Sequence, residues 1–156
     1  MNSADYKQLL KKAIIETIEN LAFIQLIEAE DPRAFDSGPG YSQDMLSVYM
    51  PVKSEYGILI MSASNAILKE TARNIFALEP DAEIGENVIN DTVSELLNTV
   101  SGQFMRSLTP KDEFYELGLP VVGTFDLSNV NGESVSCAFE TEHGDKLFIS
   151  YIRISK

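Results

Sequence analysis

Residues 84–108 contain the longest regular hydrophobic pattern of the chain, and this pattern constrains the fold most. Apolar residues recur there at intervals of three and four, which places them on one arc of a helix wide enough to pack on a sheet. These residues are Ile89, Val93, Leu96, Leu97, Val100 and Phe104. The pattern predicts one continuous helix from about Ile84 to Leu108, closing before Pro110. The rest of the chain must supply the surface that this helix covers.

A polar stripe follows the opposite face of the same predicted helix. At about 100° per residue, Asp91, Asn98 and Gly102 fall within roughly 60° of Glu95. Side chains that project from a helix whose back is held in the core keep a fixed geometry, which favours catalysis. In the alternative interpretation, Asp91 and Glu95 are solvated surface acids and Asn98 is an ordinary polar residue beside them.

Gly102 is unusual because it lies inside the predicted helix. Glycine costs about 1 kcal/mol relative to alanine there and leaves no side chain on the stripe. A partner that approaches closely would explain it. Tight packing of a neighbouring strand or helix of the same chain would explain it equally well.

Two further helices follow from the same periodicity. The first covers about residues 5–21, with Ser3 or Asp5 able to cap its start. The second begins after Ser64 or Asn65 and ends before Pro80. Its apolar set has helical spacing and consists of Ile67, Leu68, Ala72, Ile75 and Phe76.

The remaining segments have the composition and turn signals of β-strands. We predict strands over residues 22–30, 43–53, 56–63, 119–127, 133–142 and 146–154. A loop over 31–40 and turns at 54–55, 131–132 and 143–145 separate them. The predicted order is therefore α-β-β-β-α-α-β-β-β.

This order predicts an α+β fold in two layers, with helices packed on a mainly antiparallel sheet. We expect a single domain over residues 1–156. Two halves of the chain, about 1–80 and 81–156, each contain an α-β-β-β unit, which indicates an old duplication. In that comparison Glu16 and Glu19 of the first helix take the places of Glu95 and Asn98.

The charge balance limits the classes of partner. Asp and Glu total 24 against 12 Lys and Arg, so the formal net charge is -12. Nucleic acids and anionic membranes would be repelled over most of such a surface. The start of the chain lacks a basic segment followed by an apolar run, and no stretch has the roughly 18 apolar residues of a membrane span. We therefore expect a cytoplasmic protein.

Cysteine and histidine each occur once, which excludes an internal disulfide and a structural zinc site. Cys137 alternates with Val135 and Phe139 along a predicted strand and is expected in the core rather than as a nucleophile. His143 lies in a predicted turn, where no catalytic partner is evident. Chemistry must therefore come from carboxylates, amides and hydroxyls.

The sequence Asp91-x3-Glu95-x2-Asn98, followed by Gly102, resembles the signature of the CheC and CheX family of chemotaxis phosphatases. The order of elements also agrees. The single copy of the motif resembles CheX more than CheC. CheC-like proteins carry a working motif in the first helix as well, whereas Glu19 stands here where asparagine would be needed. This departure argues against a second active site.

The resemblance implies that the chain hydrolyses the aspartyl phosphate of a CheY-like response-regulator receiver. It assigns the orientation of the attacking water to Asn98 and an ion pair with the receiver lysine to Glu95, and makes Asp91 and Gly102 supporting or partner-binding residues. It also implies a homodimer, no cofactor or metal on this chain, and Mg²⁺ in the receiver.

Two other functions stay open. The same fold could act as a non-catalytic binding module that docks a receiver or a component of the flagellar switch. A small-ligand sensor would require an enclosed pocket, which no feature of the sequence demands.

Overall fold

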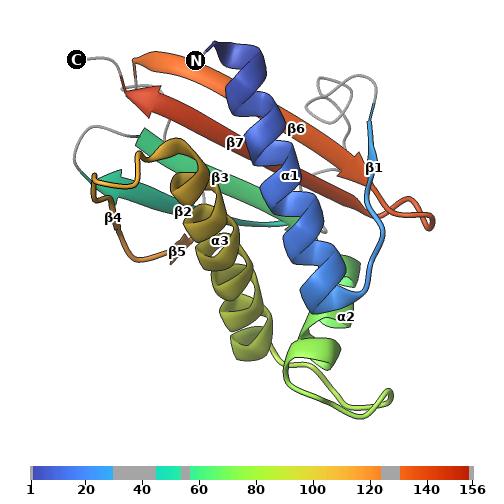
Figure 1. Cartoon of the computed structure of the whole chain (residues 1–156). Helices are drawn as coiled ribbons and strands as arrows, with labels where there is room; N and C mark the ends of the chain where they lie inside the picture. The colour runs from blue at the N-terminus through green and yellow to red at the C-terminus, as the bar shows by residue number, and fades with distance from the viewer. Residues whose placement is uncertain (1, 30–44, 54–56, 124–130, 155–156) are drawn as a thin grey trace.

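The computed structural model describes residues 2–29, 45–53, 57–123 and 131–154. Two long helices lie side by side across one face of an antiparallel sheet, and a shorter helix packs near one end of both (Figure 1). The helices are α1 (Ser3–Ala22), α2 (Asn65–Ile75) and α3 (Glu86–Leu108). The strands are β1 (Ile27–Glu28), β2 (Met45–Lys53), β3 (Gly57–Ser64), β4 (Glu116–Leu117), β5 (Val121–Val122), β6 (Gly132–Glu140) and β7 (Lys146–Ile154).

The sheet has the strand order β1-β6-β7-β3-β2-β4, and β5 also pairs with β2. All pairs of strands in the described residues are antiparallel. The predicted α+β class, with helices on an antiparallel sheet, is confirmed.

The strand order reads the same when the two halves of the chain are exchanged, because β2 then takes the place of β6, β3 that of β7, and β1 that of β4. This symmetry supports the proposal that residues 1–80 and 81–156 are duplicated halves of one domain.

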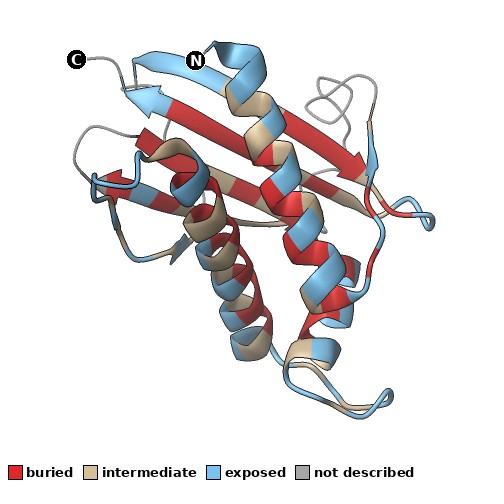
Figure 2. Cartoon of the chain, viewed as in Figure 1, coloured by how far each residue is buried: buried red, intermediate tan, exposed pale blue. Residues whose placement is uncertain are grey.

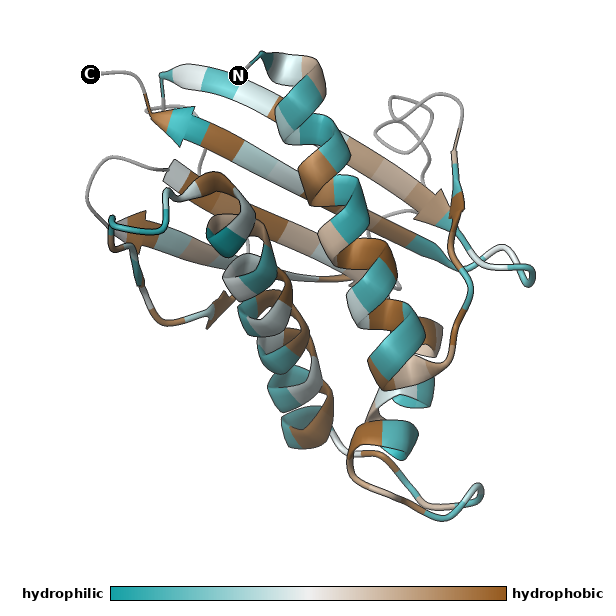
Figure 3. Ribbon diagram, viewed as in Figure 1, coloured by the Kyte–Doolittle hydropathy of each residue, from teal (hydrophilic) through white to brown (hydrophobic). Residues whose placement is uncertain are grey.

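The core lies between the sheet and the inner faces of α1 and α3 (Figure 2). Each of the six apolar residues predicted to face inward from α3 is buried, and none exceeds 8% exposure. Brown bands follow the inner side of both long helices, and teal residues occupy much of their outer side (Figure 3). Phe104 packs edge-on against Tyr151 of β7, with ring centroids 4.9 Å apart. Such aromatic contacts fix the position of α3 on the sheet.

The helix ends agree in part with the prediction. Ser64 caps α2 by accepting a hydrogen bond from the Ile67 N–H at 3.4 Å. The cap predicted for α1 was wrong, because Asn2 caps it instead. The Asn2 side chain accepts from the Asp5 N–H at 3.0 Å, and the Asp5 carboxylate accepts from the Asn2 N–H at 2.9 Å. Ser3 is therefore the first residue of the helix, and Asp5 completes a capping box.

The strand predicted over residues 22–30 was largely wrong. α1 continues through Ala22, and within the described residues 23–29 the strand is confined to Ile27–Glu28, which pairs with β6. The Ala29 N–H adds one further hydrogen bond, to the Ala138 carbonyl at 2.8 Å. Ile24 and Leu26 are buried while their neighbours are exposed, so the alternation that indicated a strand is present without ladder bonds at those residues. Burial against the core accounts for the pattern.

Residues 119–123 are the described part of the strand predicted over 119–127, and within them only Val121–Val122 forms a strand, β5. β4 precedes the predicted range at Glu116–Leu117. Pro120 has no N–H to donate and separates the two strands. The N–H of Gly118 donates to the Pro51 carbonyl at 2.7 Å, which holds this segment against β2.

The predicted loop at 31–40, the turn at 54–55 and residues 124–127 lie outside the described residues. The strands predicted at 43–53, 56–63, 133–142 and 146–154 correspond to β2, β3, β6 and β7. The predicted turn at 143–145 joins β6 to β7, with Gly144 at φ 81°.

Candidate functional site

The polar stripe of α3 is open to solvent. Asp91, Glu95 and Asn98 are exposed, and Gly102 is half-buried. The helix runs unbroken from Glu86 to Leu108, and its buried residues lie on the other face. The backbone that carries Glu95 and Asn98 is therefore fixed by the packing of α3 on the sheet.

Hydrogen bonds around the stripe leave its functional groups accessible. Thr99 Oγ1 lies 3.5 Å from Glu95 Oε1, at the limit of a hydrogen bond, so this contact leaves most of the carboxylate unoccupied. Within the part of the chain that the structure describes, the Asn98 amide has no hydrogen-bond partner. It is free to hold a water or a group of another molecule.

An open groove of about 550 Å³ lies along the stripe. α3 contributes Asp91, Ser94, Glu95 and Asn98 to its lining, α2 contributes Ile75 and Phe76, and the segment between β4 and β5 contributes Leu119 and Pro120. The groove thus combines two carboxylates and one amide with apolar side chains from two other elements. An open groove of this kind suits a macromolecular surface better than an enclosed small ligand.

Comparison with known protein families bears on the identity of this site. The family described as chemotaxis phosphatase CheX matches residues 46–140, more than half of the chain. The chain belongs to the CheX family. No curated protein matches the sequence.

Solved structures agree with this assignment at the level of the fold. CheX from Vibrio vulnificus is 16% identical with a TM-score of 0.72, and the match covers 97% of this chain and 98% of that one. CheX from Borrelia burgdorferi, solved with CheY, BeF₃ and Mg²⁺, is 16% identical with a TM-score of 0.70, covering 96% and 98%. A CheC-like protein from Shewanella oneidensis is 19% identical with a TM-score of 0.69, covering 97% and 99%.

The structure separates the two interpretations of Gly102. A Cβ atom built there meets no heavy atom within 4 Å outside its own stretch of helix. Close packing by another described element of this chain therefore does not explain the glycine. The carbonyl of Gly102 accepts a hydrogen bond from the Tyr115 hydroxyl at 3.3 Å, which holds the segment after α3 against the helix.

Cys137 is a core residue, as predicted. Its side chain is fully buried on β6, and its thiol lies 3.8 Å from the Lys7 carbonyl of α1. Burial raises the pKa of the thiol from 9.0 to about 11. Because the thiolate is the nucleophilic form, this cysteine is inert at neutral pH.

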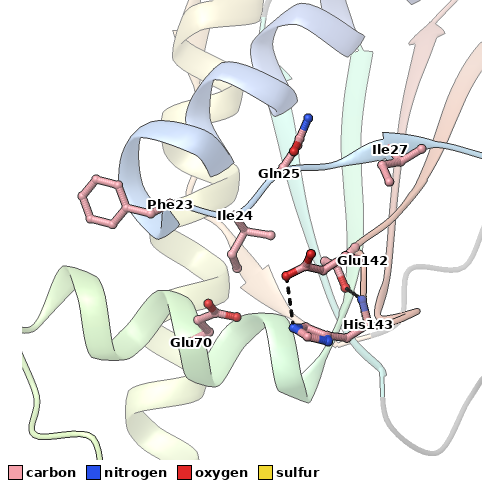
Figure 4. Close-up of a pocket in the computed structure, with 8 residues that line it drawn as sticks. Phe23, Ile24, Gln25, Ile27, Glu70, Glu142 and His143 are labelled. Carbon is pink, nitrogen blue, oxygen red and sulfur yellow. Dashed lines mark hydrogen bonds and ion pairs between the residues drawn. The ribbon is translucent and has the colours of Figure 1, made fainter.

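His143 is exposed in the turn between β6 and β7, where it borders a pocket of about 190 Å³ near the end of α1 (Figure 4). Its Nε2 lies 3.4 Å from Glu142 Oε1, and both side chains are largely exposed. In Figure 4 a dashed line joins the His143 ring to the Glu142 carboxylate. This pocket has no functional group in common with the groove along α3.

Among the described residues, no three His, Cys, Asp or Glu side chains are grouped so that they could bind a metal ion. None of the helices in the described ranges combines the length and apolar character that crossing a membrane requires.

Sequence reasoning missed Phe76, Leu119 and Pro120 as parts of the site. Phe76 was assigned to the apolar set of the second helix, yet it caps the end of α2 and is 45% exposed. Leu119 was assigned to a strand, yet it lies between β4 and β5 and is 82% exposed. The sequence signal for these residues was an apolar side chain beside a helix end or a proline, which does not by itself indicate a site.

Proposed function

We propose that this chain removes the phosphoryl group from the aspartate of a CheY-like response-regulator receiver. The observation that carries the proposal is the exposure of Glu95 and Asn98 together, one turn apart on a continuous helix, within one open groove. Membership of a family of chemotaxis phosphatases supports the same activity. We expect the reaction to take place in the cytoplasm.

Asn98 is proposed to orient the attacking water. A phosphorylated receiver already supplies an acyl phosphate, a lysine and a divalent cation, which stabilise the charge of the transition state. An amide both donates and accepts hydrogen bonds, so the Asn98 side chain can hold a water in line with the phosphorus. Water then forms the new P–O bond, the bond to the aspartate oxygen breaks, and the receiver carboxylate leaves.

Glu95 is proposed to pair with the receiver lysine. Its carboxylate lies one helical turn before Asn98 on the same face, so the ion pair would fix how far and at what angle α3 enters the receiver site. Asp91 lies one further turn back and adds negative charge toward the same lysine.

The cation of the reaction is proposed to reside in the receiver. The Borrelia burgdorferi CheX was solved in a complex that contains CheY, BeF₃ and Mg²⁺, which supports both the partner and the place of the metal. The role of this chain would then be to supply an ordered water and a docking surface.

The test is to mix the protein, at a tenth of the receiver concentration, with a panel of phosphorylated receivers and follow phosphate loss. A phosphatase clears many equivalents of at least one receiver. A non-catalytic module of the kind also considered from the sequence would bind a receiver without accelerating phosphate loss, and that result would replace the proposal.

We also propose a symmetric homodimer. β1 covers only the Phe139–Glu140 end of β6, so within the described ranges the edge of β6 from Gly132 to Cys137 has no partner strand. Such an edge can pair with the same edge of a second copy. Light scattering at micromolar concentration should give twice the mass of the chain, and a monomer would contradict the proposal.

A further inference from the structure

Two large apolar side chains beside the polar stripe are exposed to solvent in the described part of the chain. Leu119 is 82% exposed and Phe76 is 45% exposed. Both line the groove that contains Glu95 and Asn98. Other exposed apolar residues, such as Phe23 and Ile154, do not line this groove.

The two side chains come from different parts of the sequence and meet at one site. Phe76 is the C-terminal cap of α2, and Leu119 lies between β4 and β5, next to Pro120. A molecule that places a phosphoryl group at the Asn98 amide must enter this groove and cover part of its lining. Covering exposed apolar surface stabilises a complex in proportion to the area removed from water.

We propose that Phe76 and Leu119 form an apolar rim that grips the receiver surface around its phosphorylated aspartate. The rim adds to the affinity that Glu95 contributes and determines the choice among receivers, whereas Asn98 sets the rate of hydrolysis. The receiver as occupant rests on the proposed function.

The charge of the groove selects the occupant. The carboxylates of Asp91 and Glu95 line the same groove as the rim residues and the exposed amide, so a cation on the occupant would be attracted there. A receiver presents a lysine beside its phosphoryl group. A second copy of this chain, docked groove to groove, would instead bring the carboxylates of the two stripes together, and they would repel each other.

The experiment measures two quantities on Phe76→Ala and Leu119→Ala. One is the dissociation constant for the receiver loaded with beryllofluoride and Mg²⁺, using the panel member that the wild-type protein binds most tightly. The other is the split between kcat and KM for loss of phosphate from the same receiver. Phe23→Ala and Ile154→Ala are matched controls, because both side chains are exposed, at 78% and 43%, and lie outside the groove.

We expect each rim variant to weaken binding and raise KM by about tenfold, as for central apolar residues of an interface, with kcat within about twofold of wild type. The controls should leave both quantities unchanged. Because Leu119 is the more exposed residue, Leu119→Ala keeps the test valid if Phe76→Ala loses stability in thermal unfolding.

Three outcomes would contradict the proposal that Phe76 and Leu119 bind the receiver. Wild-type affinity in Leu119→Ala shows that the rim does not touch the receiver. A loss of kcat at unchanged affinity places these residues in the chemistry instead. A change of the dimer mass in the rim variants assigns the surface to a second copy.

The two proposals fail separately in this design. A receiver that is bound through the rim but not dephosphorylated overturns the phosphatase and keeps the rim. If Leu119→Ala dephosphorylates a receiver with the wild-type KM, the rim is overturned and the phosphatase is kept. Absence of binding to every receiver in the panel overturns both.

Discussion

The helices α1 and α3 are packed alike and exposed differently. α1 buries Leu10, Ile14 and Ile18 at the same intervals at which α3 buries Ile89, Val93 and Leu97. Each helix lies on the sheet beside the other, and the strand order is symmetric about them. The same packing constraint acts on both, because each must fill the space above the sheet with apolar side chains.

The solvent-facing residues of α1 and α3 differ in type. Where α3 presents Asp91, Glu95, Asn98 and Gly102, α1 has Lys12, Glu16 and Glu19, and Phe23 follows just after its end. Glu16 borders a different groove between the two helices, together with Lys12 and Arg106. α1 ends at Ala22, and Phe23 takes a left-handed conformation with φ 56°, whereas α3 continues past Gly102 to Leu108.

The difference shows that separate constraints determine the buried and the exposed residues of a helix. Buried positions are fixed by the fold and repeat in both halves of the chain. Exposed positions are free to change unless a partner requires them, so a carboxylate, an amide and a glycine in line on one helix alone point to an external partner.

The largest expected effect comes from removing both functional groups of one face. Glu95→Ala with Asn98→Ala should lower receiver dephosphorylation by at least about 100-fold, because ordering of the water and pairing with the lysine are lost together. The matched double variant Glu16→Ala with Glu19→Ala, on the exposed face of α1, should retain the wild-type rate. Equal losses in the two proteins would remove the functional difference between the helices.

A smaller effect is expected from Glu95→Ala alone. We expect the affinity for the receiver to fall by about tenfold and turnover to fall as well, because the proposed ion pair with the receiver lysine seats the helix that carries Asn98. Glu16→Ala is the control. Titration of both variants with a beryllofluoride-loaded receiver checks the prediction, and unchanged affinity of Glu95→Ala would contradict the proposed ion pair.

The smallest effect concerns Gly102. Gly102→Ala should raise the free energy of unfolding by about 0.5–1 kcal/mol, because alanine is the better helix former and its Cβ meets no described neighbour. The same change should weaken receiver binding severalfold if the glycine admits close approach of the partner. Urea unfolding and receiver titration measure the two effects, and a stabilised protein with unchanged affinity would show that no partner requires the glycine.

The sequence predicted α3 well because a pattern of 3.6-residue period continued over many turns admits no other assignment. The stripe followed from the same periodicity, since one face of a helix determines the other. The long strands were predicted from their composition and from the turn signals that bound them, and β7 matches its predicted range of 146–154.

The failures were local or tertiary. Ile24 and Leu26 alternate with exposed residues and imitate a strand, although only the neighbouring Ile27–Glu28 has a strand to pair with. Phe76 and Leu119 are far apart in the sequence, and only the fold brings them to the groove. The periodicity of a single segment does not predict which distant residues come together in the fold.

The most direct test of the central claim is the turnover of Asn98→Ala at saturating receiver. The exposed amide has no partner in the described chain, so its removal should leave stability unchanged or slightly higher. We predict a loss of about 100-fold or more in kcat, with the dissociation constant for the beryllofluoride-loaded receiver within about threefold of wild type. Wild-type turnover in Asn98→Ala would contradict the mechanism, even though the family assignment would stand.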